Sequence, residues 1–243
     1  MHKIFELGDW NDLACLGSED LQNPMLNLVR EQFAKHGVPI EKAGDLEEAL
    51  KLIRNTLNQT VWLYGCERPR ALKDLDVNCR AQEVEFFFSV GDDGERFAIT
   101  DNRSAGNPPN YVKGEIDLLY SYTDDKDNWR MGILDWKTSS VRENDRLEEM
   151  MLNHHYELQA QIYTDALDHF LKTRIGDGYA REKNLAKPIY VFLRACGTGK
   201  VDNGVWTPGD EEWRADRWAK LREAGADVKL VDGNVLMKMV FEG

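Results

Sequence analysis

Two apolar segments that carry charged residues constrain this chain more than any other part of its sequence. Residues 114–119 read Gly-Glu-Ile-Asp-Leu-Leu, and residues 133–138 read Ile-Leu-Asp-Trp-Lys-Thr. Each has the composition of a buried β-strand, yet Asp117 and Asp135 interrupt the apolar run. An ionised carboxylate among such side chains is unstable without a partner or a metal ion. The two segments therefore predict neighbouring strands with a charged site between them.

The spacing within these segments predicts which side chains meet. Side chains alternate along a strand, so Asp135 and Lys137 project from one face while Trp136 points to the other. If the strands pair, Asp117 approaches Asp135, and two close carboxylates repel unless a cation lies between them. Oxygen ligands suit Mg²⁺ or Mn²⁺, and the Trp136 carbonyl is a natural further ligand. Lys137 could then orient an attacking water or stabilise charge on a phosphate oxygen. The alternative is a surface strand with an ordinary Asp–Lys ion pair.

The order of the expected elements indicates the fold class. The first sixty residues have helical spacing, with Asp45 and Glu48 in the pattern of a capping box at a helix start. A long helix is expected over residues 145–174, closed by Gly176, and a charged helix over residues 210–223. Strands are expected at residues 83–88, 111–120, 131–136 and 189–194, with turns at residues 91–94 and 124–128 and a surface loop at residues 101–110. Strands and helices in this order predict one α/β domain with a mixed sheet covered by helices.

The long expected helix places polar side chains beside the charged strands. Tyr156, Gln159 and Tyr163 lie on one side of it, at i, i+3 and i+7. Gln159 and Tyr163 can therefore reach the strands together. Taken by themselves, however, these residues are better explained by an ordinary amphipathic helix with Gln and Tyr at its boundary. In that interpretation Leu158, Ile162, Leu167 and Phe170 are expected to pack inward.

Composition narrows the function classes. The chain has 243 residues with 31 Lys and Arg against 43 Asp and Glu, a formal net charge of −12. Binding of long nucleic acid by a broad basic face is thereby excluded, and any DNA binding must come from a local site or from a partner. No apolar run is long enough to span a bilayer, and acidic residues occupy the N-terminus, so we expect a cytoplasmic protein with no membrane contact. The four cysteines form no C-x-x-C pair, which argues against a zinc ribbon.

Taken together, these segments resemble the RecB-like nuclease domains of the PD-(D/E)xK superfamily. The resemblance covers nearly the whole chain up to Trp206. It is carried by residues 1–6, 29–31, 83–86, 113–118, 134–139, 155–164, 190–194 and 204–206. It implies a restriction-endonuclease-like mixed sheet flanked by helices, with a helical front end at residues 1–60 and a catalytic core at 82–206. Residues 207–243 match poorly and form a divergent C-terminal element.

The resemblance also assigns roles to residues. It implies that His2, Asp117, Asp135 and the Trp136 carbonyl hold Mg²⁺, with Mn²⁺ able to substitute. It further implies that Asp135 and Lys137 are catalytic and that Gln159 and Tyr163 order the site or touch DNA. Glu83 and Glu115 are candidates to support a second ion, although a surface role fits them better. The cysteine spacing differs from that of iron–sulfur nucleases, so no cluster is expected.

Three functions follow as expectations. The first is metal-dependent hydrolysis of DNA, mainly single-stranded, in double-strand-break repair, recombination or DNA degradation, with helicase subunits or a RecA-like recombinase as partners. The second is an interaction module that keeps the nuclease fold, docks to such a recombinase or helicase and cleaves little. The third is an acidic mimic of nucleic acid. The complete set of Asp117, Asp135 and Lys137 favours the first, because a pure binding protein has no need of it. The chain cannot unwind DNA itself, because it has no Walker A motif.

Overall fold

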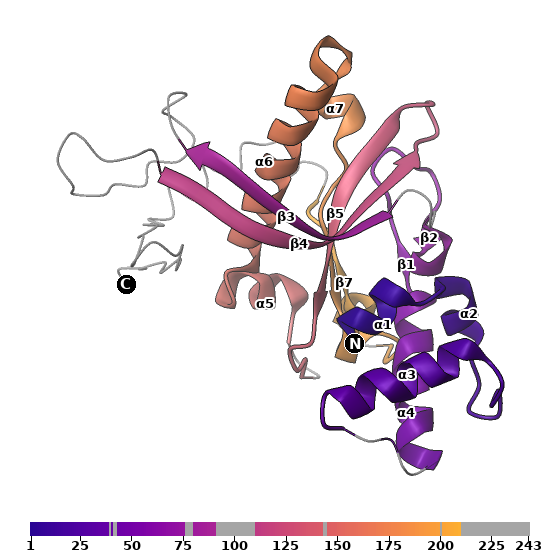
Figure 1. Ribbon diagram of the computed structural model, residues 1–243. Helices are drawn as coiled ribbons and strands as arrows, with labels where there is room; N and C mark the ends of the chain where they lie inside the picture. The colour runs from indigo at the N-terminus through magenta and orange to yellow at the C-terminus, as the bar shows by residue number, and fades with distance from the viewer. Residues whose placement is uncertain are drawn as a thin grey trace.

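A computed structural model describes residues 1–38, 40, 43–75, 80–90, 110–142, 145–199 and 201–209 (Figure 1). Its helices are α1 (His2–Leu7), α2 (Trp10–Cys15), α3 (Pro24–Lys35), α4 (Ala43–Leu57), α5 (Leu147–Asn153), α6 (Tyr156–Ile175) and α7 (Arg181–Asn184). Its strands are β1 (Thr60–Val61), β2 (Arg70–Ala71), β3 (Arg80–Val90), β4 (Asn110–Thr123), β5 (Trp129–Lys137), β6 (Ile189–Phe192) and β7 (Val205–Trp206). The helical front end and the four expected strands are confirmed, whereas the short β1–β2 pair was not predicted.

The main sheet is mixed, as expected for an α/β fold. Its strand order is β3-β4-β5-β6-β7, and β5 and β6 are parallel while the other neighbours are antiparallel. The parallel step requires a crossover, which α5, α6 and α7 provide. The sheet strand β6 ends at Phe192, and Leu193–Ala195 form a 3₁₀ turn, so the strand expected to reach residue 194 is shorter than predicted.

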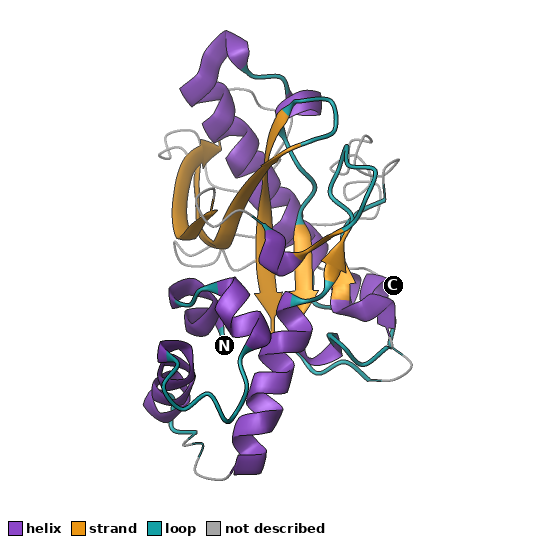
Figure 2. Cartoon of the chain, turned by 90° about the vertical axis from the view of Figure 1, so that its right-hand side faces the viewer, coloured by secondary structure: helices purple, strands orange, loops and turns teal. Residues whose placement is uncertain are grey.

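Helices cover both faces of this sheet. The α1–α4 group lies at one end of the molecule, away from the upper part of α6 (Figures 1 and 2). Its apolar side chains form one core with Leu118, Tyr120 and Trp136 of the sheet. Residues Leu119 and Ile133 instead form a core with α6. The site-bearing strands β4 and β5 are thus held from both sides.

Two helix boundaries differ from the sequence prediction. Helix α4 begins at Ala43, so Asp45 lies in its first turn rather than at its N-cap. The long helix expected over residues 145–174 is broken into α5 and α6, because His155 adopts a left-handed backbone conformation with φ of 57°. That conformation ends a right-handed helix, and a periodicity argument cannot detect it. The closure of α6 at Gly176 is confirmed.

The alternation of side chains inverts in the middle of the β3–β4 pair. Leu118 packs with α1–α4, whereas Ile116, two residues earlier, packs with α6. On β3 the Gln82 amide approaches the Phe5 carbonyl of α1, whereas Val84 packs with the α6 cluster. Between them Glu83 has φ of 48°, which is unusual for a residue other than glycine. The pairing is interrupted between Gln82–Leu118 and Val84–Ile116, so the inversion places Asp117 where the pleat turns over.

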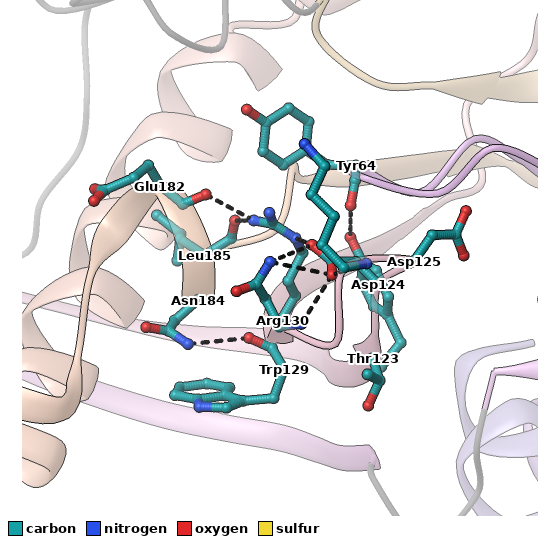
Figure 3. Close-up of polar contacts among 12 residues, drawn as sticks. Tyr64, Thr123, Asp124, Asp125, Trp129, Arg130, Glu182, Asn184 and Leu185 are labelled. Atoms are coloured by element: carbon teal, nitrogen blue, oxygen red, sulfur yellow. Dashed lines mark hydrogen bonds and ion pairs between the residues drawn. The ribbon is translucent and has the colours of Figure 1, made fainter.

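A buried ion pair ties the β4–β5 turn to the rest of the fold (Figure 3). Arg130 Nε donates to Asp124 Oδ2 over 2.7 Å, and the Arg130 side chain also donates to the Glu182 carbonyl over 3.0 Å. Asp124 Oδ1 accepts from the backbone N–H groups of Lys126 and Asn128, both over 2.9 Å. These bonds confirm the expected turn at residues 124–128 and join it to α7.

Several expectations lie outside the described residues: the turn at 91–94, the loop at 101–109, the helix at 210–223 and Cys79. The assignment of all 243 residues to one domain stays a prediction. Within the part of the chain that the structure covers, no helix is long and apolar enough to cross a membrane.

Candidate active site

Asp117 lies where β4 meets β5 and α1. Leu118 pairs with Leu134, and this register brings Asp117 to the level of Asp135. The Trp136 N–H donates to Asp117 Oδ2 over 2.9 Å, which fixes the carboxylate against β5. His2 Nδ1 of α1 is 3.7 Å from the same oxygen. The structure therefore brings together three of the predicted site residues that are far apart in the sequence.

Asp135 is the most buried charged group of this site, with 3% of its surface exposed. Burial raises the pKa of Asp135 to about 7, with a further increase from the nearby Asp117 carboxylate, while Lys137 opposes the rise. Asp135 Oδ1 is 2.7 Å from Lys137 Nζ but forms no well-aligned hydrogen bond among the described residues. A buried carboxylate so poorly solvated has capacity for a further cation.

Lys137 connects the strands to α6 through a chain of polar contacts. Lys137 Nζ donates to Gln159 Oε1 over 2.8 Å, and Gln159 Nε2 donates to the Tyr163 hydroxyl over 2.9 Å. The Lys137 ammonium also lies 4.1 Å from the ring centroid of Tyr156 and 5.2 Å from that of Tyr190. Such ring contacts hold an ammonium in place while shielding it from water. The predicted grouping of Tyr156, Gln159 and Tyr163 on one side of the helix is confirmed.

Helix α1 is docked onto β5 through the residue between Asp135 and Lys137. The ring of Phe5, which is 1% exposed, stacks on Trp136 with 4.6 Å between centroids. Trp10 packs edge-on against the Trp136 ring, and the Trp10 indole N–H donates to the Phe5 carbonyl. Sequence reasoning placed Trp136 on the opposite face but missed these partners, because contacts across 126 or more residues leave no local pattern. The helix that carries His2 is thereby positioned beside Asp117.

The other acidic candidates lie at the margin of the site. Glu83 accepts a hydrogen bond from Lys3 of α1 over 2.8 Å, which lowers the pKa of Glu83. Glu115 is exposed and lies opposite Glu85 in the β3–β4 register. A role for Glu83 or Glu115 in binding a second ion stays a prediction. Sequence reasoning also missed the role of Tyr190. This residue lies on β6, which was predicted only as a strand, and its buried ring lies next to the Lys137 ammonium.

The donor set fits a divalent metal ion by its chemistry. One imidazole, two carboxylates and a backbone carbonyl would be supplied by His2, Asp117, Asp135 and Trp136, and hard oxygen donors suit Mg²⁺. Asp135 Oδ1, which lacks an aligned hydrogen bond, is the atom most in need of a cation. Among the residues described, however, no three His, Cys, Asp or Glu side chains are grouped as they would be around an ion. The metal ligands therefore stay a prediction.

Gly114 allows Phe86 and Tyr163 to approach β4. A Cβ atom at this position would lie 2.4 Å from Phe86 Cζ and 3.3 Å from Tyr163 Cε1. We expect Gly114→Ala to push the Phe86 ring aside, to destabilise the fold by about 1–3 kcal/mol and to weaken catalysis through Tyr163. Urea unfolding and cleavage rates measure both effects. Gly178→Ala, whose Cβ would meet only a methyl group at 3.3 Å, is the control. Equal unfolding free energies for the two variants would contradict the expected clash.

Comparison with known proteins shows the family of this chain. The chain is 30% identical to the RecBCD enzyme subunit RecB of Escherichia coli (strain K12) over 156 residues, which are 56% of this chain and 13% of RecB. The chain thus matches a small part of that relative. Residues 1–232 match the family described as the PD-(D/E)XK nuclease superfamily, and this range includes every site residue discussed above. The chain belongs to the PD-(D/E)XK nuclease superfamily.

Proposed function

We propose that this chain is a metal-dependent deoxyribonuclease that hydrolyses phosphodiester bonds, chiefly in single-stranded DNA. The observation that carries the proposal is the contact chain from Asp135 through Lys137 and Gln159 to Tyr163, beside Asp117 and His2. Nothing among the described contacts resembles a base-reading element, which supports cleavage with little sequence preference. Membership of the PD-(D/E)XK nuclease superfamily supports a nucleic-acid substrate, and the similarity to the RecBCD enzyme subunit RecB is consistent with it.

The residues divide the chemistry between them. His2, Asp117, Asp135 and the Trp136 carbonyl would hold Mg²⁺, or Mn²⁺ in its place, and such an ion acidifies a bound water and polarises a phosphoryl oxygen. The Lys137 ammonium is held by Gln159, so it can orient the attacking water or stabilise negative charge on a phosphate oxygen. Tyr156 and Tyr190 keep water from two sides of that ammonium, which strengthens its interaction with an anion.

We further propose a setting for the reaction. The chain would act in the cytoplasm, in double-strand-break repair, recombination or degradation of DNA. Because its net charge of −12 disfavours tight binding of free DNA, a helicase subunit or a recombinase would bring the strand to the site. The same charge favours the second hypothesis, in which the nuclease fold serves mainly as a docking module. Cleavage by the chain alone separates the two.

The test is cleavage of labelled single-stranded and double-stranded DNA by the whole chain with Mg²⁺, with Mn²⁺ and with EDTA. We expect cutting of the single strand that requires the metal and that is lost in Asp135→Asn. If clean, folded protein shows no metal-dependent cutting, the nuclease proposal for this chain is wrong and the docking function replaces it.

His2 provides a second test of the proposed metal site. His2→Ala removes a proposed nitrogen ligand beside Asp117. We therefore expect the Mg²⁺ concentration for half-maximal cleavage to rise about tenfold or more, while the cleavage rate at saturating Mg²⁺ changes less. A metal titration of the cleavage rate measures this. His36→Ala, at the exposed end of α3, is the matched control. An unchanged metal requirement in His2→Ala would remove His2 from the ligand set.

A further inference from the structure

An apolar groove runs between the edge strand β3 and helix α6. Its volume is about 340 Å³. The sheet wall includes Val84, Phe86 and Ile116, and the helix wall includes Ala166, Phe170 and Arg174. Phe170 was expected to pack inward, but 50% of its surface is exposed. The prediction was wrong because Leu167 and Leu171 fill the core position on this side of α6. The molecule thus presents an aromatic face to solvent inside a groove.

The groove continues the candidate active site along the same helix. Gln159, Tyr163, Ala166, Phe170 and Arg174 follow one another at intervals of three or four residues, so they share one face of α6. The continuity is also physical, because the Phe86 ring of the groove wall packs edge-on against Tyr163 at 5.4 Å. At a rise of 1.5 Å per residue, Phe170 lies roughly 10 Å beyond Tyr163. That distance corresponds to a few nucleotides of a single strand.

We propose that this groove is a subsite for a nucleobase of single-stranded DNA, with Phe170 as its stacking platform. The inference rests on the proposed nuclease function and adds a place where the strand is held away from the cleavage site. Single-stranded nucleic acids are bound by aromatic rings on which bases stack, combined with cations that follow the backbone. Phe170 supplies the ring, and the Arg174 guanidinium, 6.0 Å from its centroid, supplies the cation.

The charges around the groove orient the strand. Glu85 lines the sheet side and Arg174 lines the helix side, so phosphates are repelled from β3 and attracted toward α6. The apolar wall formed by Val84 and Ile116 favours a base rather than a phosphate. Because every base has an aromatic face, such a subsite binds without sequence preference. A base bound in the groove would hold the DNA strand along α6. A phosphodiester a few nucleotides away would then lie near Lys137, which contacts Gln159 at the other end of this helix face.

A scan with abasic oligonucleotides tests this subsite. The protein is titrated in Ca²⁺ with 12-mer oligothymidylates that carry one abasic site at each position in turn. For the native chain we expect affinity to fall about five- to hundredfold at one or two adjacent positions. Phe170→Ala should lose a similar factor on the intact oligomer and become insensitive to those positions. Phe170→Tyr should keep the native profile, and Leu152→Ala, at an exposed apolar position on α5, should change nothing.

The outcomes separate the subsite from the nuclease function. A flat abasic profile in the native chain, or an unchanged profile in Phe170→Ala, overturns the subsite. If that occurs while the native chain cuts single-stranded DNA, only the subsite is wrong. If the native chain neither binds nor cuts single-stranded DNA, both proposals fail. A thermal melt of Phe170→Ala shows whether the variant is folded, which its half-exposed position leads us to expect.

Discussion

Replacing Lys137 by alanine should reduce cleavage of single-stranded DNA by about 10²–10³-fold at saturating metal and substrate. The ammonium is held by Gln159, Tyr156 and Tyr190, and a water that enters the space left by the side chain carries no positive charge. The rate constant for cleavage should fall while the affinity for DNA in Ca²⁺ changes little, because the loss concerns the reaction rather than binding. Single-turnover cleavage assays measure the rate constant.

Three variants make the interpretation of Lys137→Ala specific. Lys183→Ala removes an exposed lysine of α7 and should leave the rate unchanged. Gln159→Ala removes the hydrogen bond that holds the ammonium but keeps the ammonium itself. Its rate constant for cleavage should therefore lie between those of the native chain and of Lys137→Ala. Lys137→Met keeps most of the side-chain volume and tests whether lost packing accounts for the effect. A native cleavage rate in Lys137→Met would contradict a catalytic role for Lys137.

Breaking the buried pair of Asp124 and Arg130 should have the largest effect on stability. Arg130→Met leaves the Asp124 carboxylate, whose side chain is fully buried, without its cation, and should lower the free energy of unfolding by about 3–5 kcal/mol. The double variant Asp124→Asn with Arg130→Met should lose less free energy of unfolding than the sum of the two single losses, because no uncompensated charge remains. Urea unfolding at pH 7 measures all three. Additive losses would show that the two side chains are not coupled.

The same pair predicts a pH dependence. Burial alone would raise the pKa of Asp124, but the bonds from Asn128, Arg130 and Lys126 outweigh it and lower the pKa to about 2 from 3.8. A carboxylate with a lowered pKa stabilises the fold above its unfolded value, so this contribution is complete above pH 4 and is lost as the pH falls toward 2. The contribution of the Asp124 carboxylate to the free energy of unfolding amounts to about 2 kcal/mol. In Asp124→Asn that part of the acid dependence should be missing.

Much of the fold could be predicted because its signals are local. The strands around Asp117, Asp135 and Ile189 are short apolar runs, so β4, β5 and β6 were found with small errors in their limits. The front end is periodic, so its helical character was found as well. The break at His155 and the start of α4 were missed, because neither a single left-handed residue nor the first residue of a helix is marked by hydrophobic periodicity. The short strands β1 and β2 have two residues each, too few for an alternation pattern.

The site could be predicted in part for the same reason. Alternation within one strand joined Asp135 to Lys137, and helical spacing joined Gln159 to Tyr163; the contacts of both pairs are confirmed. The resemblance supplied His2, which local pattern would have left as a solvated residue near the terminus. Tyr190 and Phe5 were missed because they meet the site only through tertiary packing, and Phe170 was placed in the core because helical spacing does not show which apolar residues a fold leaves exposed.

The inversion of the pleat at Glu83 and Asp117 has a consequence for how this protein can change over time. It changes which face of the strand pair the even-numbered residues occupy: Leu118 packs with α1–α4, whereas Val84 and Ile116 of the outer part pack with α6 and line its groove. Substitutions in the outer part reach the groove without passing through the larger core. Under the proposed function, the side chains of the outer part that line the groove can change how DNA is bound while the core shared with α1–α4 stays the same.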